Sequence, residues 1–278
     1  MINFNGTLVS HSNENIEKNR GFLYGDAVFE TLKIFENKIL FSEDHYFRLM
    51  ASMRILRMEI PMEFNLEFME NEILKLTNHL NLSHARVRLT VFRTGTGRYL
   101  PKQRTTGFLI TAESTQNMYA ISEGKYEIEI YKDFHISKNL LNTLKTTNRL
   151  VNITASIFAE ENSYENCLLI NEDKNIIEAI NGNVFVVKDQ TIVTPPVSDG
   201  CINGILRKKL IDIIVKDASY TFEERSISPF ELQKADEIFI TNCIQGIQSV
   251  TKYRKKDFTN EIASKLLVKL NAQIRFNS

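Results

Sequence analysis

The chain of 278 residues has no excess of charge of either sign, few cysteines and no long apolar run. Lys plus Arg and Asp plus Glu both total 34, so no bulk basic field favours nucleic acid or an anionic membrane. The three cysteines are far apart and form no C-x-x-C motif, which argues against a disulfide framework or a zinc ribbon. No apolar stretch approaches the ~18 residues of a membrane span, and the amino terminus lacks the basic and apolar regions of a signal peptide. We therefore expect a soluble cytoplasmic protein without nucleic-acid or membrane partners.

The composition is that of an ordinary globular protein, with 43% hydrophobic, 24% charged and 10% aromatic residues. The length suits one large domain or two of medium size. Periodicity is lost after Glu113, so we place an N-terminal domain at 1–116, a linker at 117–124 and a C-terminal domain at 125–278. Strand-rich segments alternate irregularly with helical ones, which predicts an α+β fold. The five histidines show no spacing typical of a metal site.

Hydrophobic periodicity predicts the elements of both domains. In the first domain, segments 27–35 and 38–41 form a hairpin, and segments 85–93 and 107–113 are neighbouring strands. A helix over 42–56 has Ser42 as its N-cap and carries Leu49, Met50, Met53 and Leu56 on its core face, and a second helix covers 65–80. The second domain is predicted to contain strands at 126–132, 166–171, 175–180, 182–189, 190–195 and 235–242, and helices near 148–161, 202–215 and 258–274.

Three side chains and one helix start suggest chemistry by their type and setting. Lys145 lies in "LKTTNRLVN", a short polar run between apolar stretches, and Arg48 is either a solvated helix arginine or a fork for a phosphate. Glu178 follows two isoleucines in "NIIEAINGNVF", which indicates either a glutamate in solvent or a buried carboxylate with a cationic partner. Gly204 and Ile205 begin a helix, where unpaired N–H groups bind phosphate, although most such junctions are only turns. Together these groups match the needs of pyridoxal phosphate: an amine, a carboxylate for the ring nitrogen and a phosphate cup.

Six motifs occur in order along nearly the whole chain: "GFLYGDAVFET", "HYFRLMAS", "LKTTNRLVN", "IIEAINGNVF", "TPPVSDGCINGILR" and "ADEIFITN". In this series the chain resembles the class IV pyridoxal-phosphate enzymes, which include branched-chain and D-amino-acid aminotransferases and aminodeoxychorismate lyase. The resemblance implies the fold type IV architecture of two α+β domains with pyridoxal 5'-phosphate in the cleft between them. It also implies a small-molecule amino substrate and a homodimer whose partner contributes to each active site.

The same resemblance assigns roles to individual residues. Lys145 matches the catalytic lysine, which holds the cofactor as a Schiff base and removes the α-proton, and Glu178 matches the partner of the ring nitrogen. Arg48 matches the arginine that grips the phosphate. The other cofactor-binding positions implied are Arg149, Gly204, Ile205, Leu206, Asn242 and Cys243. Many relatives have Thr or Ser, as a phosphate hydroxyl, where this chain has the cysteine.

Residues beside the lysine and at the helix start distinguish members of the family. Many aminotransferases of the class have "NYL" after the lysine, where this chain has "NRL" with Arg149, and "INGILR" resembles the lyase form more than the "PGITR" of branched-chain aminotransferases. The predicted substrate-binding residues are Tyr24, Phe29, Lys33, Arg93 and Arg98. Paired basic groups suit the two carboxylates of aminodeoxychorismate.

We therefore predict an aminodeoxychorismate lyase that forms 4-aminobenzoate and pyruvate in folate biosynthesis. Two alternatives stand beside it. One is an aminotransferase acting on branched-chain or D-amino acids with 2-oxoglutarate, because Arg149 could simply replace one cofactor contact with another hydrogen-bond donor. The other is an inactive relative that serves as a binding protein, although the presence of Lys145 and Glu178 argues against it.

Overall fold

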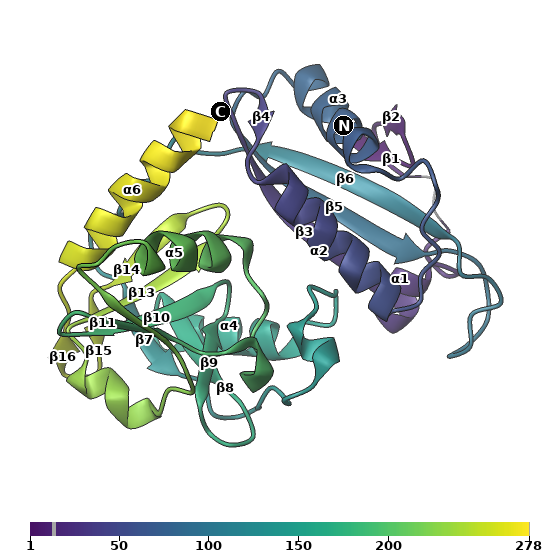
Figure 1. The fold of residues 1–278 in the computed structure, drawn as a ribbon. Helices are drawn as coiled ribbons and strands as arrows, with labels where there is room; N and C mark the ends of the chain where they lie inside the picture. The colour runs from purple at the N-terminus through teal and green to yellow at the C-terminus, as the bar shows by residue number, and fades with distance from the viewer. Residues whose placement is uncertain (13–14, 278) are drawn as a thin grey trace. The chain divides into compact units, whose positions relative to one another are not determined.

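Two compact units make up the part of the chain that the computed structural model describes, residues 1–12 and 15–277 (Figure 1). Unit 1 comprises Met1–Met118 and Lys145–Asn148, and unit 2 comprises Tyr119–Leu144 and Arg149–Ser278. The first division falls inside the predicted linker of residues 117–124. The predicted second domain runs without interruption over 125–278, whereas in the structure Lys145–Asn148 belongs to unit 1. Within this segment, Thr146 forms an antiparallel bridge with Val28 of unit 1.

Unit 1 is built on a six-stranded antiparallel sheet in the order β2-β1-β6-β5-β3-β4. Its strands are β1 (Ile2–Phe4), β2 (Thr7–Val9), β3 (Ala27–Phe35), β4 (Lys38–Ile39), β5 (Ala85–Arg93) and β6 (Thr106–Ser114). In β5, Val87, Leu89 and Val91 are buried, whereas Arg86 and Arg88 alternate with them on the other face. The predicted hairpin and the predicted pairing of β5 with β6 are both confirmed.

Helices α2 (Ser42–Ile55) and α3 (Leu66–His79) lie along one face of this sheet, and the short α1 (Arg20–Tyr24) precedes β3 (Figure 1). The buried stripe Leu49, Met50 and Met53 packs into the core of the unit, as its spacing predicted. Ser42 is not the N-cap of α2, so that prediction is wrong. The turn after β4 puts Phe41 in the left-handed conformation, with φ of 56°, and the chain enters the helix directly at Ser42.

Unit 2 contains two five-stranded sheets in the orders β12-β11-β10-β13-β14 and β16-β15-β7-β8-β9. The strands are β7 (Glu127–Ile130), β8 (Asn166–Ile170), β9 (Ile176–Ala179), β10 (Asn183–Lys188), β11 (Thr191–Thr194), β12 (Thr221–Glu224), β13 (Glu237–Asn242), β14 (Gly246–Val250), β15 (Lys252–Tyr253) and β16 (Lys256–Asp257). Apolar residues of both sheets, among them Ile128, Leu168, Val184 and Ile238, share one core. The six strands predicted in this half are confirmed, whereas the short β12 and β14 to β16 were not foreseen.

The helices of unit 2 are α4 (Leu150–Glu161), α5 (Ile205–Val215) and α6 (Glu261–Asn277), with the 3-10 turns η1 (Leu140–Thr143), η2 (Val197–Asp199) and η3 (Pro229–Lys234). All three α-helices were predicted, and the mixture of helices with largely antiparallel sheets confirms the α+β class. Within the described ranges, no helix has the length and apolarity needed to cross a membrane.

Candidate active site

Lys145 lies in an extended segment that runs alongside the start of β3. Phe29 N donates a hydrogen bond to Lys145 O at 2.8 Å, and Thr147 N donates to Ala27 O at 3.1 Å. These bonds fix the backbone of Lys145. The lysine is half-buried, and its Nζ lies 4.5 Å from the centre of the Phe29 ring. Because an aromatic face attracts a cation, the ring helps to hold the amine in place. Phe29, predicted on the substrate side, is thus a direct neighbour of the predicted catalytic lysine.

A second cation reaches the same ring. Arg88, from β5, places its Cζ 3.6 Å from the centre of the Phe29 ring, and burial together with the nearby charge of Arg86 lowers the pKa of its guanidinium. The sequence did not single out Arg88 as a functional residue. Its alternation with the apolar residues of β5 indicated only that it lies on the polar face of a half-buried strand. The register that pairs Phe29 with Thr90 is what brings the guanidinium to the ring.

Lys33 follows Phe29 on the same face of β3, four residues along the strand. It is 2% exposed, its Nζ donates to Gln116 O at 3.0 Å, and burial lowers the pKa of its amine. The face of the sheet that carries Phe29 therefore presents two partly desolvated cations, Lys33 and Arg88. Poorly hydrated cations of this kind favour a carboxylate partner.

Arg48 lies toward the opposite face of β3, where Glu30 binds it. Arg48 Nε donates to Glu30 Oε1 at 2.8 Å, Arg48 Nη2 donates to Oε2 at 2.5 Å, and His45 Nδ1 lies 2.7 Å from Oε2. Burial raises the pKa of the Glu30 carboxyl, but the charge and hydrogen bonds of Arg48, with those of His45, outweigh burial and lower it to about 2. The fork expected to grip a phosphate thus already engages a carboxylate, and a phosphate contact of Arg48 stays a prediction.

The other predicted substrate-side residues lie at or near the loop of residues 94–105. Tyr24 is exposed at the end of α1, with its ring edge-on to Tyr99 at a centroid distance of 6.0 Å, and Arg98 is exposed within the loop. Arg93 is 6% exposed, and its three nitrogens donate to Asp26 and to two carbonyls at the end of α2. These donors are directed at protein acceptors, and a substrate contact of Arg93 stays a prediction.

Unit 2 buries the carboxylate that the sequence singled out. Glu178, in β9, is 3% exposed, and its Oε2 accepts a hydrogen bond from Ile202 N at 2.9 Å. Asn183 Nδ2 donates to Ile202 O at 2.8 Å, so both sides of the Ile202 backbone are held. The interpretation of Glu178 as a glutamate in solvent is therefore wrong, and the carboxylate lies beside the chain that leads into α5.

The start of α5 offers backbone N–H groups. Gly204 is the N-cap, no side chain of the described residues caps the helix, and the first intrahelical bond runs from Lys208 N to Gly204 O at 3.0 Å. The N–H groups of the first turn, which include those of Ile205 and Leu206, have no partner within the helix and favour an anion. Glycine is required here by close approach, because a Cβ would lie 1.9 Å from Asn183 Oδ1.

Asn242 and Cys243 lie where β13 turns into β14. Asn242 Oδ1 accepts hydrogen bonds from Ile244 N at 3.0 Å and Gln245 N at 2.9 Å, so this side chain shapes the turn. The buried Tyr119 also holds this turn, because its OH donates to Cys243 O at 2.6 Å. Contacts of Asn242 and Cys243 with a cofactor stay predictions.

Arg149 closes the loop that contains the lysine. It is the N-cap of α4, and its Nη2 donates to Leu144 O. Leu144 immediately precedes the segment Lys145–Asn148 and Arg149 immediately follows it, so the guanidinium joins the two ends of the segment. A tyrosine at this position has a single hydroxyl on a rigid ring and lacks the forked donors of arginine.

The chemistry of these groups fits pyridoxal phosphate. Lys145, in unit 1, is an amine, and Glu178, in unit 2, is a buried carboxylate of the type that pairs with a protonated ring nitrogen. Unit 2 also supplies a helix start at Gly204 where the backbone is open to an anion, because no side chain of the described residues caps it. Each of these groups is the type that the cofactor requires at one of its three polar positions.

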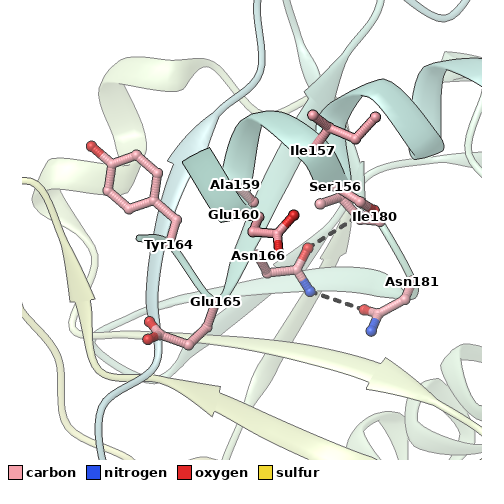
Figure 2. A pocket seen from close by; sticks show the side chains of 9 residues that line it. All are labelled: Ser156, Ile157, Ala159, Glu160, Tyr164, Glu165, Asn166, Ile180 and Asn181. Atoms are coloured by element: carbon pink, nitrogen blue, oxygen red, sulfur yellow. Dashed lines mark hydrogen bonds between the residues drawn. The ribbon is translucent and has the colours of Figure 1, made fainter. Parts of the chain in front are cut away.

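A separate pocket of about 490 Å³ in unit 2 has a different character (Figure 2). Its lining includes Glu160, Glu165 and Tyr164, together with Asn166, whose Nδ2 donates to Asn181 Oδ1 at 2.9 Å. No lysine or arginine belongs to this lining among the described residues, so the pocket does not suit a phosphate. Among residues 1–12 and 15–277, no three His, Cys, Asp or Glu side chains are grouped as metal ligands.

Comparison with known proteins shows a match to one family over most of the chain. Residues 27–253 match the profile of the family described as amino-transferase class IV. The D-alanine aminotransferase of Bacillus licheniformis is 27% identical over 89% of this chain and 86% of its own length.

Solved structures agree with that match. A Legionella pneumophila protein to which 4-amino-4-deoxychorismate lyase activity is attributed is 25% identical, with a TM-score of 0.83 and 96% of each chain covered. The branched-chain aminotransferase of Thermobaculum terrenum, in its pyridoxal-phosphate form, shares the fold at 19% identity, with a TM-score of 0.87 over 100% of this chain and 94% of its own.

Proposed function

Because the chain belongs to the class IV aminotransferase family, whose members bind pyridoxal phosphate, we propose that it is a 4-amino-4-deoxychorismate lyase that releases 4-aminobenzoate and pyruvate. The observation that carries the proposal is Arg149, which stands where many aminotransferases of the class have tyrosine and which joins the two ends of the lysine segment. The helix start "INGILR" and the 25% identity to the Legionella protein support the same choice.

Three parts of the chain would hold the cofactor: Lys145, Glu178 and the first turn of α5 after Gly204. Bound pyridoxal phosphate supplies an aldehyde that bonds to amines. It also supplies a protonated ring that withdraws electrons from the substrate carbon that bears the amine. Glu178 would hold the proton at the ring nitrogen, because the negative charge of a buried carboxylate favours the protonated, cationic form of a neighbouring base. The N–H groups of Ile205 and Leu206 hold the phosphate.

Lys145 moves the proton in this proposal. Its unprotonated amine takes the proton from the carbon that bears the substrate amine. Breaking the C–O bond of the substrate's enolpyruvyl group releases an enolpyruvate anion, and the protonated Nζ would return its proton to this leaving group, which becomes pyruvate. The Phe29 ring, 4.5 Å from Nζ, restricts where the amine can reach and stabilises its charged form.

Arg88 and Lys33 are the groups we propose for substrate carboxylates within unit 1, with Arg98 as an exposed cation in the loop. The substrate carries two carboxylates, and desolvated cations bind such groups more strongly than solvated ones. Arg88 is placed for this role because its guanidinium shares the Phe29 ring with Lys145 Nζ.

The second candidate is an aminotransferase that uses branched-chain or D-amino acids with 2-oxoglutarate. It is favoured by the relative from Bacillus licheniformis, a D-alanine aminotransferase that matches 89% of this chain. The same cations would serve it, because 2-oxoglutarate is also a dicarboxylate. The two reactions differ in what regenerates the enzyme: the lyase completes its cycle alone, whereas the aminotransferase stops until a keto acid arrives.

One assay separates them. The enzyme with pyridoxal phosphate is given aminodeoxychorismate alone in one tube, and a branched-chain or D-amino acid with 2-oxoglutarate in another. We expect steady release of pyruvate and 4-aminobenzoate in the first tube. Steady glutamate formation in the second tube without pyruvate in the first contradicts the lyase and supports the aminotransferase. Activity in neither tube, with the variant Lys145→Ala as the inactive control, favours a binding protein.

We also propose a homodimer. Helix α4 exposes Leu150 by 76%, Ile153 by 53% and Ile157 by 48%, and their spacing places them on one side of the helix. An apolar stripe of this kind is typical of a surface that another chain covers. Light scattering of the holoenzyme measures the mass, and a monomer at every concentration tested contradicts the proposal.

A further inference from the structure

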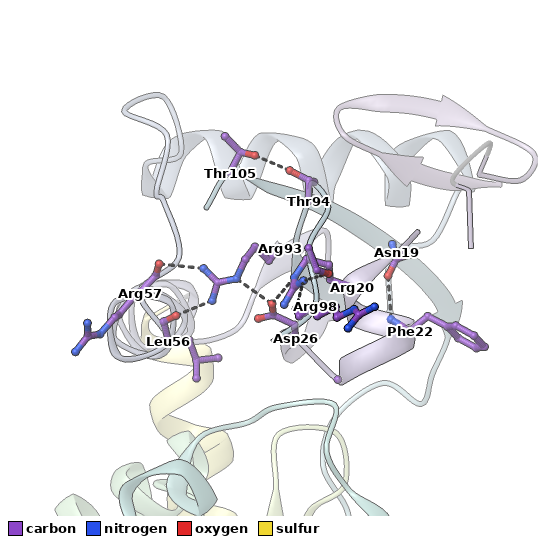
Figure 3. Close-up of polar contacts among 12 residues, drawn as sticks. Asn19, Arg20, Phe22, Asp26, Leu56, Arg57, Arg93, Thr94, Arg98 and Thr105 are labelled. Atoms are coloured by element: carbon purple, nitrogen blue, oxygen red, sulfur yellow. Dashed lines mark hydrogen bonds and ion pairs between the residues drawn. The ribbon is translucent and has the colours of Figure 1, made fainter. Parts of the chain in front are cut away.

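Two buried arginines converge on one carboxylate where β3 begins and β5 ends (Figure 3). Arg20 Nε and Arg93 Nε each lie 2.9 Å from Asp26 Oδ2, and the two arginines are 3% and 6% exposed. We call this group the Arg20–Asp26–Arg93 cluster. Hydrogen bonds between buried ions are strong, and the loss of one partner leaves an uncompensated charge. The cluster therefore holds together the three segments of unit 1 that carry Arg20, Asp26 and Arg93.

Arg20 extends the cluster to the loop of residues 94–105. Its Nη1 donates to Gly97 O at 2.9 Å and to Arg98 O at 2.7 Å, so one nitrogen holds two consecutive carbonyls. This part of the loop requires glycine, because Gly97 has φ of 115° and a Cβ there would lie 2.4 Å from Leu100 O. The backbone of Arg98 is thus held from the interior, while its side chain is exposed.

Arg93 extends the cluster to helix α2. Its Nη1 donates to Arg57 O at 3.0 Å and its Nη2 to Leu56 O at 2.6 Å, where the helix ends. Carbonyls at a helix end carry partial negative charge, so a guanidinium stabilises them. The carboxylate of Asp26 consequently links the end of α2 to the loop that carries Arg98.

The cluster also adjoins the lysine segment. Gly25, which precedes Asp26, accepts hydrogen bonds at its carbonyl from Thr147 Oγ1 at 3.2 Å and Asn148 Nδ2 at 3.0 Å. Within unit 1, hydrogen bonds and the peptide bond between Gly25 and Asp26 therefore connect the backbone of Arg98, through Arg20, to the segment that contains Lys145.

We propose that Arg20 is a positioning residue that fixes the loop of residues 94–105 so that Arg98 binds a carboxylate of the substrate. The inference rests on the proposed function, in which Arg98 is a substrate-side cation. Arg20 itself is buried and directs Nε and Nη1 at protein acceptors, so it acts through the loop. A lysine cannot replace it, because one ammonium cannot reproduce donors on two separate nitrogens.

The test compares holoenzymes with Arg20→Lys, Arg98→Ala and both changes, with Arg225→Lys as the matched control. Arg225 also forks between two carboxylates, those of Glu223 and Glu231, but at an exposed site. We expect Arg20→Lys to raise the KM for aminodeoxychorismate about tenfold or more with little change in kcat, because a small misplacement of a binding group is costly. We also expect faster hydrogen exchange of the amides in residues 94–105. The control should change neither quantity.

The effect of Arg20→Lys on KM should depend on the presence of Arg98. In the Arg98→Ala background, Arg20→Lys should add less than about twofold to KM, because coupled residues are not additive. Effects on KM that multiply, unchanged exchange of the loop, or an unchanged KM in Arg98→Ala would each overturn the proposal.

Failure of the lyase activity is a different result from failure of the positioning role. If the wild type forms no pyruvate, the KM values of the same variants are measured with the amino acid that it transaminates. The outcomes given above then support or overturn the positioning role of Arg20 in the same way. If Arg20→Lys does not fold, Arg20→Gln replaces it, because glutamine leaves Asp26 paired with Arg93 and cannot donate both to Asp26 and to the two loop carbonyls.

Discussion

Glu30→Gln removes the charge of a carboxylate that is 1% exposed and is held by Arg48 and His45. The pKa of this carboxyl is about 2, compared with an ordinary value of 4.5. A shift of this size corresponds to roughly 3 kcal/mol of stability at neutral pH. Because glutamine cannot carry the charge that balances Arg48, we expect the variant to lose about that amount, which agrees with ~3 to 5 kcal/mol for breaking a buried ion pair.

The pH dependence has a defined sign. The folded pKa of Glu30 lies below the unfolded value, so its contribution is fully present above pH ~4.5 and is lost as the pH falls toward about 2. The wild type should therefore lose more stability than Glu30→Gln between pH 5 and about 2. The two curves of unfolding free energy against pH should approach each other at the acid end.

The assay is urea unfolding of the cofactor-free proteins, followed by circular dichroism at several pH values, because bound cofactor would add its own stability. Glu113→Gln is the matched control: Glu113 Oε1 lies 2.7 Å from Arg86 Nη1, but the two side chains are 63% and 40% exposed. Exposed pairs contribute at most about 1 kcal/mol. A loss below ~1 kcal/mol at pH 7 in Glu30→Gln, or an unchanged acid dependence, would refute the reasoning about this buried carboxylate.

Three further predictions concern unit 2. Glu178→Gln should leave the fold intact and slow removal of the α-proton by roughly a hundredfold or more, measured by single-turnover exchange of that proton; unchanged exchange contradicts the role of this carboxylate. Gly204→Ala should weaken binding of pyridoxal phosphate, measured by titration of its visible absorption, because the new Cβ would come within 1.9 Å of a side-chain oxygen and displace the start of α5. Iodoacetamide should alkylate the half-buried Cys243 before Cys201, which is fully buried and whose thiol has a pKa raised by burial to about 12. Mapping of the labelled peptides checks this order, and early labelling of Cys201 in the folded protein would contradict it.

The sequence by itself determined the elements and the chemical types of the site. Helices such as α2 and strands such as β5 follow from the spacing of apolar residues a few positions apart, and the order of six motifs identified the family and predicted the role of Lys145. It predicted the type of Glu178 but left open whether that carboxylate is buried. Local pattern carries this information because side-chain periodicity depends only on the local backbone geometry.

Only the tertiary structure decided which of these groups meet. The pairing of β3 with β5 brings Arg88 to the ring beside Lys145, and a bridge to β3 places Lys145–Asn148 in unit 1. The same fold engages Arg48 with Glu30 and turns Arg93 inward, which residue type alone did not foretell. Such contacts depend on register and on packing between segments far apart in the chain, and a one-residue change of register would send each side chain to the opposite face of its sheet.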